Sequence, residues 1–365
     1  MAIDILLDIG TFIISIICGF IFIPLTLNFC KSKGLYDIPN KRKMHRKLIP
    51  RLGGITFIPS MIIAAFVAIV TLDNEPELGR RIPLNLWTIL FVFSLLIIYV
   101  TGIIDDLLGL SVGIKFTVQT IAAALMPFAG LSINNLHGFC GIYEIPTLAG
   151  IVLTVFVFVF ITNAINLIDG IDGLAASLSL TALLGLLYGY ARQGLNSYCI
   201  IIAGMAGVLI PYLYFNIFGK VEKNRKIFMG DSGSLTLGFV LSFLTVKYIM
   251  VNGSSMPVDG SRMLLAYTLL IIPIFDVIRV VFHRIHYHAP VFKADKSHIH
   301  HKLMQAGCSM HQTLGVIMAM ALLYIPLNIW LFSKTSITAV VLTDIVIYTS
   351  FNLALNYKIS KKNTN

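Results

Sequence analysis

The sequence predicts an all-α, polytopic integral membrane protein with about eleven transmembrane helices. Of its 365 residues, 57% are hydrophobic and only 12% are charged, and the mean hydropathy is +0.87. Soluble domains carry about 25% charged residues, so this composition places the chain in a bilayer. A helix of about 20 apolar residues spans the roughly 30 Å hydrocarbon layer. Windows of that kind cover residues 5–29, 53–72, 84–104, 112–131, 148–168, 174–191, 197–215, 232–251, 262–282, 313–332 and 336–356.

The basic residues predict the orientation, because short basic loops are retained on the cytoplasmic side. Eight Lys and Arg residues lie between Lys31 and Arg51, which places that loop inside, the N-terminus outside and the C-terminus in the cytoplasm. This topology puts 21 of the 27 basic residues inside and 6 outside. Loop retention explains the net charge of +10 better than nucleic-acid binding does, so no nucleic-acid partner is expected. With no internal repeat or linker, residues 1–365 form one predicted integral domain.

The acidic residues are distributed unevenly in this topology. An Asp at the centre of a membrane helix costs about 2.5 to 3.5 kcal/mol on insertion scales, so acids kept next to spans indicate function. The acids on the outer side are scattered among ordinary loop residues. The acids at the cytoplasmic ends of different spans are Asp105, Asp106, Asp169, Asp172 and Asp231.

The first polar motif is GIIDDLLG, from Gly102 to Gly109, at the end of the third window. The adjacent carboxylates of Asp105 and Asp106 repel, which raises one pKa unless a cation neutralises the pair. Such a pair suits Mg²⁺ or a general base. A solvated helix end explains it equally well.

The second motif runs from Asn163 to Leu174, with the sequence NAINLIDGIDGL. Its polar groups recur every three residues, which places Asn163, Asn166 and Asp169 near one face of a helix. The two glycines indicate that the helix ends or bends there and exposes N–H groups to a ligand. A capped terminus explains one Asn and one Asp but not four polar groups, so a functional role is favoured.

The third motif, FMGDSGSLTLG from Phe228 to Gly238, lies at the start of the eighth window. Its small residues would let backbone donors approach an anion, and Asp231 could hold a metal on that anion. A helix N-cap formed by Asp231 or Ser232 is equally consistent. The motif lacks the Gly-Lys-Ser or Gly-Lys-Thr of a Walker sequence, so ATP is not implied.

The fourth motif is a basic loop that contains His298, His300 and His301. Three histidines within four residues could bind zinc, but no Cys accompanies them. Contacts to phosphate or sugar are favoured, and a solvated basic loop remains the alternative. Nearby, Asp276 and Arg279 have the spacing of a structural ion pair, whereas Asp344 lies mid-span with no partner evident in the sequence.

Together these motifs resemble the polyprenyl-phosphate N-acetylhexosamine-1-phosphate transferases, or glycosyltransferase family 4. The run from Asp295 to His301 is similar to the WecA/TagO-type branch, whereas the muramoyl-pentapeptide branch has a Pro-hydrophobic-His-His-His run there. Acids at Asp169 and Asp172 indicate a bacterial type. The matching segments are DIPNKRKMH from Asp37, RLGG from Arg51, Asp105–Asp106, NAINLIDGIDGLA from Asn163, FMGDSGSLTLG from Phe228, PIFD from Pro273 and HIHHKL from His298.

The resemblance implies a role for each matched residue. Asp231 and Asn166 would hold Mg²⁺, or Mn²⁺ in its place, on the donor diphosphate. Asp105 and Asp106 would serve the acceptor phosphate or the metal region. Where some members continue Asp-Asp-x-x-Asp, this chain has Gly109, so a third acid is excluded there. The expected substrate contacts are Asn163, Asp169, Asp172, Asn216, Phe228, His298, His300 and His301, with Lys43 and His45 near the lipid phosphate.

The function that the resemblance implies is transfer of N-acetylhexosamine-1-phosphate from a UDP-sugar to undecaprenyl phosphate, with release of UMP. The expected enzyme lies in the inner (plasma) membrane with its site facing the cytoplasm, and starts a cell-wall or lipopolysaccharide polymer. A homodimer is left open. The alternatives are a UDP-MurNAc-pentapeptide phosphotransferase and a secondary transporter. A transporter should keep its acids near the midplane and show a repeat, and this sequence does neither.

Overall fold

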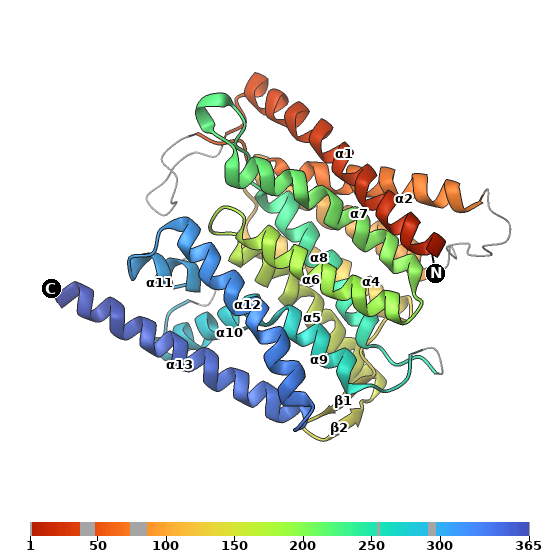
Figure 1. Ribbon diagram of the computed structural model, residues 1–365, viewed down its shortest axis with the longest axis vertical. Coiled ribbons are helices and arrows are strands. Elements are labelled where there is room, and N and C mark those ends of the chain that lie inside the picture. The colour runs from red at the N-terminus through yellow and green to blue at the C-terminus, as the bar shows by residue number, and fades with distance from the viewer. Residues whose placement is uncertain (1, 37–47, 74–85, 254–255, 291–296, 365) are drawn as a thin grey trace.

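The computed structural model describes residues 2–36, 48–73, 86–253, 256–290 and 297–364, and its fold is almost entirely helical (Figure 1). A small antiparallel hairpin, β1 (Asn135–Phe139) with β2 (Ile142–Glu144), joins α4 to α5. The long helices of the first half are α1 (Ala2–Lys33), α2 (Phe57–Asp73), α3 (Leu86–Leu108), α4 (Val112–Phe128), α5 (Thr147–Ile168) and α6 (Leu174–Arg192). Those of the second half are α7 (Asn196–Leu213), α8 (Gly230–Ile249), α9 (Gly260–Leu269), α10 (Ile271–His286), α11 (Ile299–Gln305), α12 (Met310–Phe332) and α13 (Ile337–Thr364). Short turns of 3-10 or π helix cover Gly53–Thr56, Tyr214–Phe218 and Val221–Lys223.

Every predicted apolar window overlaps a helix of the structure. Among the described residues, eight helices are long and apolar enough to cross a membrane, or nine if α9 and α10, bent by 69°, form one broken span. The windows 53–72 and 112–131 correspond to the shorter apolar helices Gly53–Ala68 and Val112–Phe128. The membrane character is therefore shown by eight or nine candidate spans, and the count of eleven stays a prediction.

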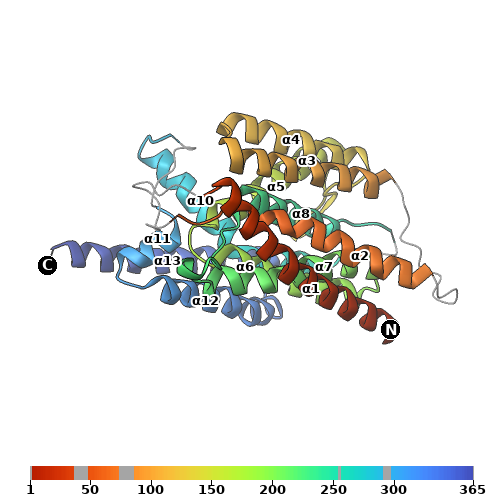
Figure 2. The same ribbon diagram turned by 90° about the horizontal axis from the view of Figure 1, so that it is seen from above.

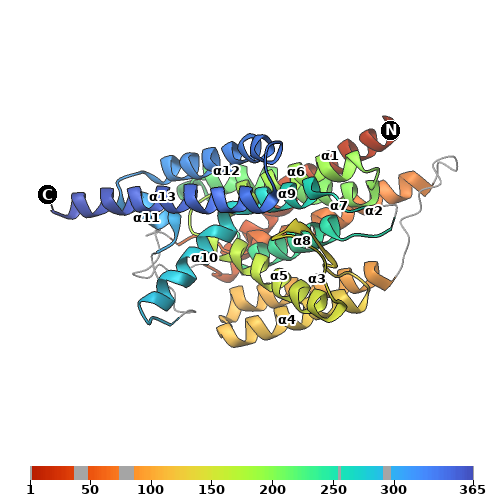
Figure 3. The ribbon, with the colours of Figure 1, turned by 90° about the horizontal axis from the view of Figure 1, so that it is seen from below.

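Helix α8 forms the centre of the bundle, between the α3–α4 pair and α6 with α7 (Figures 2 and 3). Nearly all of its residues are buried, including Ser232, Thr236 and Ser242. The hydroxyls of Thr236 and Ser242 donate to helix carbonyls, Thr236 Oγ1 to the carbonyl oxygen of Ser232 at 2.6 Å and Ser242 Oγ to that of Gly238 at 2.7 Å. Small residues let the neighbouring backbones come close, which is how helices associate without a hydrophobic driving force. Thus a Cβ at Gly238 would lie 2.6 Å from Thr162 Cα.

The two chain ends lie at opposite ends of the bundle (Figure 1). The C-terminus, α11 and the turn between α3 and α4 share one end, and the N-terminus lies at the other (Figure 2). Polar motifs that are far apart in the sequence are therefore gathered at the end that holds the C-terminus.

Helix α13 packs through a buried stripe that includes Asp344 and Tyr348, four residues apart. Asp344, which is 0% exposed, accepts hydrogen bonds from Tyr267 Oη at 3.0 Å and Asn328 Nδ2 at 2.9 Å. An acid within an apolar segment normally pairs inside the bundle. Asp344 thus joins α13 to α9 and α12, which explains the residue that had no evident partner in the sequence.

Gly102→Ala should separate α3 from α8, because a Cβ at Gly102 would lie 2.5 Å from Ser232 Cα and 2.7 Å from the carbonyl oxygen of Asp231. Backbone atoms cannot rotate away, so overpacking should lower the free energy of unfolding by about 1 to 3 kcal/mol. Thermal unfolding of the purified protein measures this change. The matched control is Gly315→Ala, since Gly315 has nothing within 4 Å of a Cβ. Equal melting temperatures for the two variants would contradict the close contact.

Candidate functional site

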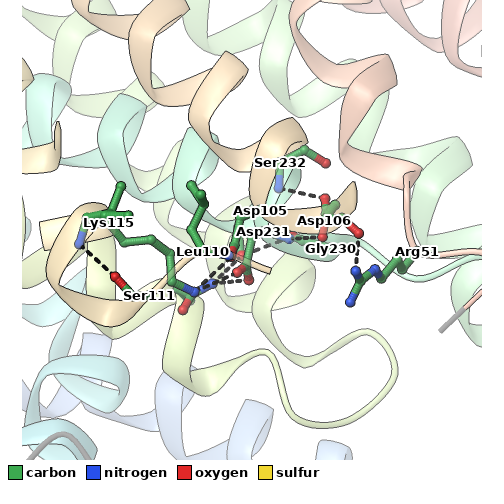
Figure 4. Close-up of polar contacts among 12 residues, drawn as sticks. Arg51, Asp105, Asp106, Leu110, Ser111, Lys115, Gly230, Asp231 and Ser232 are labelled. Atoms are coloured by element: carbon green, nitrogen blue, oxygen red, sulfur yellow. Dashed lines mark hydrogen bonds and ion pairs between the residues drawn. The ribbon is translucent and has the colours of Figure 1, made fainter. Parts of the chain in front are cut away.

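The carboxylate of Asp106, at the end of α3, caps the N-terminus of α8 (Figure 4). Its two oxygens accept hydrogen bonds from the backbone N–H groups of Asp231 at 2.9 Å and Ser232 at 3.0 Å. The alternative in which Asp231 or Ser232 forms the N-cap is wrong, because the N-cap residue of α8 is Met229 and makes no side-chain cap bond. Gly230 has φ +71°, and a Cβ there would lie 2.1 Å from the carbonyl oxygen of Arg51.

Lys115, on α4, joins the first and third motifs. Its Nζ lies 2.8 Å from Asp105 Oδ2 and 3.0 Å from Asp231 Oδ2 (Figure 4). The other oxygen of Asp105 accepts a hydrogen bond from the backbone N–H of Leu110 at 2.6 Å. One ammonium group therefore offsets two carboxylates that would otherwise repel each other.

Asn166, from the second motif, contacts the same acid. Its Nδ2 donates to Asp231 Oδ1 at 2.7 Å and to Ser234 Oγ at 2.8 Å. Asn163, one turn earlier, instead bonds to Gln119 Oε1 on α4 at 2.5 Å and so ties α5 to α4. Asp105, Lys115, Asn166 and Asp231 thus form one cluster from four different helices.

The donor set of this cluster fits a hard divalent cation that is bound together with phosphate. Mg²⁺ is usually held by one or two carboxylates, with phosphate oxygens and water completing the octahedron. Asp231 and Asp105 supply two such carboxylates. No group of three or more His, Cys, Asp or Glu within the described ranges could hold a metal by itself. Asn166 turns its amide N–H toward Asp231, so its direct ligation of the metal stays a prediction.

A second group of polar residues links the loop after α5 to the loop before α8. Lys226 Nζ lies 2.6 Å from Asp172 Oδ2 and also donates to the carbonyl oxygen of Asn216. Asn216 Oδ1 accepts from the N–H of Gly173 at 2.6 Å, and its Nδ2 donates to the carbonyl oxygen of Ile227 at 2.7 Å. These buried bonds fix the relative positions of the two loops.

Asp169, at the end of α5, has a carboxylate with no hydrogen-bond partner among the residues that the structure describes. Burial, with smaller contributions from Asp172 and Asp106, raises the pKa of Asp169 to about 7. A carboxyl group with a pKa near 7 is partly protonated at neutral pH, so it can donate a hydrogen bond to a ligand or accept one from it.

The histidine segment is held by Asp276 of α10, which is 0% exposed. His298 Nδ1 lies 2.8 Å from Asp276 Oδ2, and the N–H of Ile299 donates to Oδ1 at 2.9 Å. The ion pair predicted between Asp276 and Arg279 is confirmed, at 2.7 Å. Tyr348 of α13 adds its hydroxyl at 3.4 Å. A buried carboxylate with four donors fixes the start of α11.

His300 brings the histidine segment against the second motif. It is 1% exposed, and neither ring nitrogen has a hydrogen-bond partner in the described part of the chain. A Cβ at Gly170 would lie 2.1 Å from His300 Nε2, so only glycine leaves room for this ring. Burial, followed by the neighbouring His301, lowers the pKa of His300 to about 3 and keeps the ring neutral. His301 lies beside it, with ring centroids 4.1 Å apart.

Comparison with known proteins identifies the family. The model of glycosyl transferase family 4 matches residues 87–249. A probable undecaprenyl-phosphate N-acetylglucosaminyl 1-phosphate transferase of Bacillus subtilis is 31% identical over 345 residues, which cover 93% of this chain and 86% of that protein. The chain belongs to glycosyl transferase family 4.

Two further relatives of this family 4 chain are named undecaprenyl-phosphate alpha-N-acetylglucosaminyl 1-phosphate transferases. That of Yersinia pestis is 32% identical over 80% of this chain and 75% of its own length. That of Escherichia coli K12 is 30% identical over 87% of this chain and 83% of its own. The apolar helices and these relatives make the protein a multi-pass membrane transferase.

The candidate site brings together most of the residues predicted from the sequence. Asp105, Asp106, Asn166 and Asp231 meet at the α8 terminus, while Phe228 is fixed through backbone bonds to Pro50 and Gly53. Sequence reasoning missed Lys115 and Lys226. Lys115 could have been found because it is a lysine inside an apolar window. Lys226 had no sequence signal beyond its place in a basic loop. Asp37, Lys43, His45 and Asp295 lie outside the described residues.

Asp106→Ala should leave two N–H groups at the buried start of α8 without an acceptor. Each such loss costs about 1 to 3 kcal/mol, so the melting temperature should fall and the spacing between Asp105 and Asp231 should loosen. Asp106→Asn keeps one acceptor oxygen, so its melting temperature should lie between those of Asp106→Ala and the wild type. Thermal unfolding of the two Asp106 variants gives these melting temperatures. The control is Glu144→Ala, because Glu144 is exposed. An Asp106→Ala protein as stable as the control would contradict the cap.

Asp276→Ala should release the histidine segment, because Arg279 and His298 lose the carboxylate that they share. Removing one partner of a buried ion pair destabilises a protein by about 3 to 5 kcal/mol. Tyr348→Phe removes a single neutral donor and should cost only about 0.5 to 1.5 kcal/mol. Denaturant unfolding of the two variants measures the loss in the free energy of unfolding. An equal loss for both variants would contradict the central role of Asp276.

Proposed function

We propose that this chain transfers N-acetylglucosamine-1-phosphate from UDP-N-acetylglucosamine to undecaprenyl phosphate and releases UMP. Three relatives that align with 80% to 93% of the chain carry names for this reaction. The observation that carries the proposal is the junction of Asp105, Lys115 and Asp231, where one cation faces two carboxylates at the end of the bundle. The product would be the first lipid-linked intermediate of a cell-envelope polysaccharide.

The reaction is an attack by a phosphate oxygen of the lipid on the β-phosphorus of the UDP-sugar. Bound to Asp231 and Asp105, Mg²⁺, or Mn²⁺ in its place, would offset the charge of the diphosphate and of the leaving UMP. Lys115 contacts both carboxylates and could move onto a phosphate oxygen once the substrates bind. Positioning and charge compensation supply most of the catalysis in phosphoryl transfer.

Asp105 positions the acceptor in this proposal and does not need to deprotonate it. The second pKa of a phosphate monoester is about 6, so the attacking oxygen is already ionised near neutral pH. Both oxygens of Asp105 are engaged, one by Lys115 and the other by the N–H of Leu110. Asp106 acts through the α8 terminus, because its carboxylate is occupied by two backbone donors.

The donor nucleotide and sugar would occupy the loops after α5 and before α8. Asp169, Asp172, Asn216 and Phe228 would line the nucleotide pocket, next to the buried bonds that fix these loops. The neutral ring of His300 reaches the same loop at Gly170 and still has free nitrogens among the described contacts. It could therefore bind a sugar hydroxyl or a phosphate oxygen, with His298 and His301 beside it.

We further propose eleven crossings, with the N-terminus outside and the C-terminus and active site in the cytoplasm of the inner membrane. The opposite positions of the two chain ends support an odd number of crossings (Figure 1). The basic residues support the direction. A broken span such as α9 with α10 also occurs in secondary transporters, but here the acids gather at one end of the bundle.

Release of UMP by the purified protein tests the function. The assay contains Mg²⁺, undecaprenyl phosphate and, in separate reactions, UDP-N-acetylglucosamine, UDP-N-acetylgalactosamine or UDP-MurNAc-pentapeptide. We expect UMP only with the lipid acceptor and UDP-N-acetylglucosamine, loss of activity with EDTA, and its return with Mg²⁺ or Mn²⁺. Lys115→Gln should reduce kcat by about 10² to 10³, as removal of one well-placed charge donor does.

The control variant is Lys334→Gln, because Lys334 is an exposed lysine outside the site. Its turnover should equal that of the wild type. No UMP from any donor, in protein with an unchanged melting temperature, would overturn the proposed function. UMP from UDP-MurNAc-pentapeptide would assign the chain to the other branch.

A further inference from the structure

A cavity of about 470 Å³ lies between α6, α8, α9 and α12, away from the proposed active site. It is lined by the last turns of α6, α8 and α12 and by the first turns of α9, including Arg192, Tyr248, Asp259 and Phe332. Tyr248 lies 17 residues along α8 from Asp231, a distance of about 26 Å at 1.5 Å per residue. The cavity therefore belongs to the opposite end of the bundle.

One part of the cavity wall carries two hydrogen-bond donors. Arg192 is exposed, and its guanidinium group lies over the ring of Tyr188 and donates to the Tyr188 hydroxyl at 3.1 Å. The hydroxyl of Tyr248 makes no hydrogen bond within the described ranges. A Cβ at residue 189 would lie 2.5 Å from this hydroxyl, so Gly189 leaves it room. A guanidinium group and a free phenol suit a phosphate.

Two acceptors lie in the same wall. Gln193 Oε1 is buried and has no partner among the described residues. The carboxylate of Asp259 caps α9 by accepting from Ser261 N at 2.9 Å and from Ser261 Oγ at 2.8 Å, and it keeps spare lone pairs. A primary ammonium group has three N–H donors and would satisfy both acceptors. The cavity thus offers a complement to both charges of a zwitterion.

Most of the remaining wall is apolar, and it lies toward the membrane. Leu265, Ile325, Ile329 and Phe332 supply it. Ile329 is 60% exposed on the surface of α12, and Tyr188 is 60% exposed on α6, which is the character of a membrane-facing surface. A ligand that fits has a charged head at the helix ends and an apolar tail along α9 and α12.

We propose that this cavity binds one zwitterionic membrane phospholipid with a primary ammonium headgroup, such as phosphatidylethanolamine. Its phosphate contacts Arg192 and Tyr248, its ammonium group contacts Gln193 and Asp259, and an acyl chain lies against Ile325 and Ile329. A groove filled by any bilayer lipid would show no headgroup preference. Selectivity for the headgroup therefore distinguishes a specific phospholipid site from a groove that any bilayer lipid fills.

The test measures binding of short-chain lipids to the delipidated full-length protein, by native mass spectrometry and by the shift in melting temperature. The lipids are phosphatidylethanolamine, phosphatidylcholine, phosphatidylglycerol and undecaprenyl phosphate. We expect phosphatidylethanolamine to bind roughly tenfold more tightly than the other two phospholipids, because only it offers both the phosphate and the N–H donors. Phosphatidylcholine has the same charges but no N–H group, which isolates the ammonium contact.

Arg192→Gln should remove most of this binding, and Lys334→Gln, an exposed lysine at the same end, should retain it. Asp259→Asn keeps an N-cap residue for α9 and should abolish the preference for phosphatidylethanolamine over phosphatidylglycerol. The melting temperatures without lipid show that the variants fold. Equal binding of all lipids, or full binding by Arg192→Gln, would overturn the proposal. Tighter binding of undecaprenyl phosphate at Arg192 would replace it with a second acceptor-lipid site.

Discussion

The candidate site depends on the contact between the Asp106 carboxylate and the first N–H groups of α8. These two bonds join the end of one span to the start of another, where Asp106 and Ser232 are buried and an unpaired backbone group would be destabilising. The contact is close because Gly102 and Gly230 have no side chains to separate the backbones. As a consequence, Asp105 and Asp231 are brought near enough for one lysine to contact both.

That lysine accounts for how the chain keeps two carboxylates together before any ligand arrives. Without Lys115, repulsion and desolvation would favour protonation of one acid, and the pair would then be a poorer site for a cation. Lys115 is not buried as deeply as Asp105, since their side chains are 22% and 5% exposed. It can therefore exchange its contacts more readily than Asp105 can, and in the proposed reaction a substrate that brings both a divalent cation and phosphates would supply replacement partners on both sides.

The sequence could predict the membrane class, the position of each apolar helix and the gathering of four polar motifs, because these follow from composition, window length and topology. It could not predict which helix supplies a partner to which acid. The N-cap alternative at Asp231 or Ser232 is wrong for this reason: local rules consider only neighbours in the chain, and Asp106 is 125 residues from Asp231. The partners of Asp344 and the contact of Lys226 with Asp172 are also non-local. Hydrophobic periodicity gave no help, since helices surrounded by lipid or by other apolar helices are hydrophobic on every side.

The C-terminal helices bear on the site even though the family model matches only residues 87–249. Asp276 holds His298 and the N–H of Ile299, and Tyr348 of α13 contacts the same carboxylate. This arrangement sets the direction of α11, whose second residue, His300, then lies against Gly170. Because Gly170 is next to Asp169, a ring fixed by the C-terminal helices meets the loop that follows α5. The geometry of the proposed donor pocket is thus determined jointly by the matched core and by α10, α11 and α13, and a change in α13 can alter this pocket without touching any substrate.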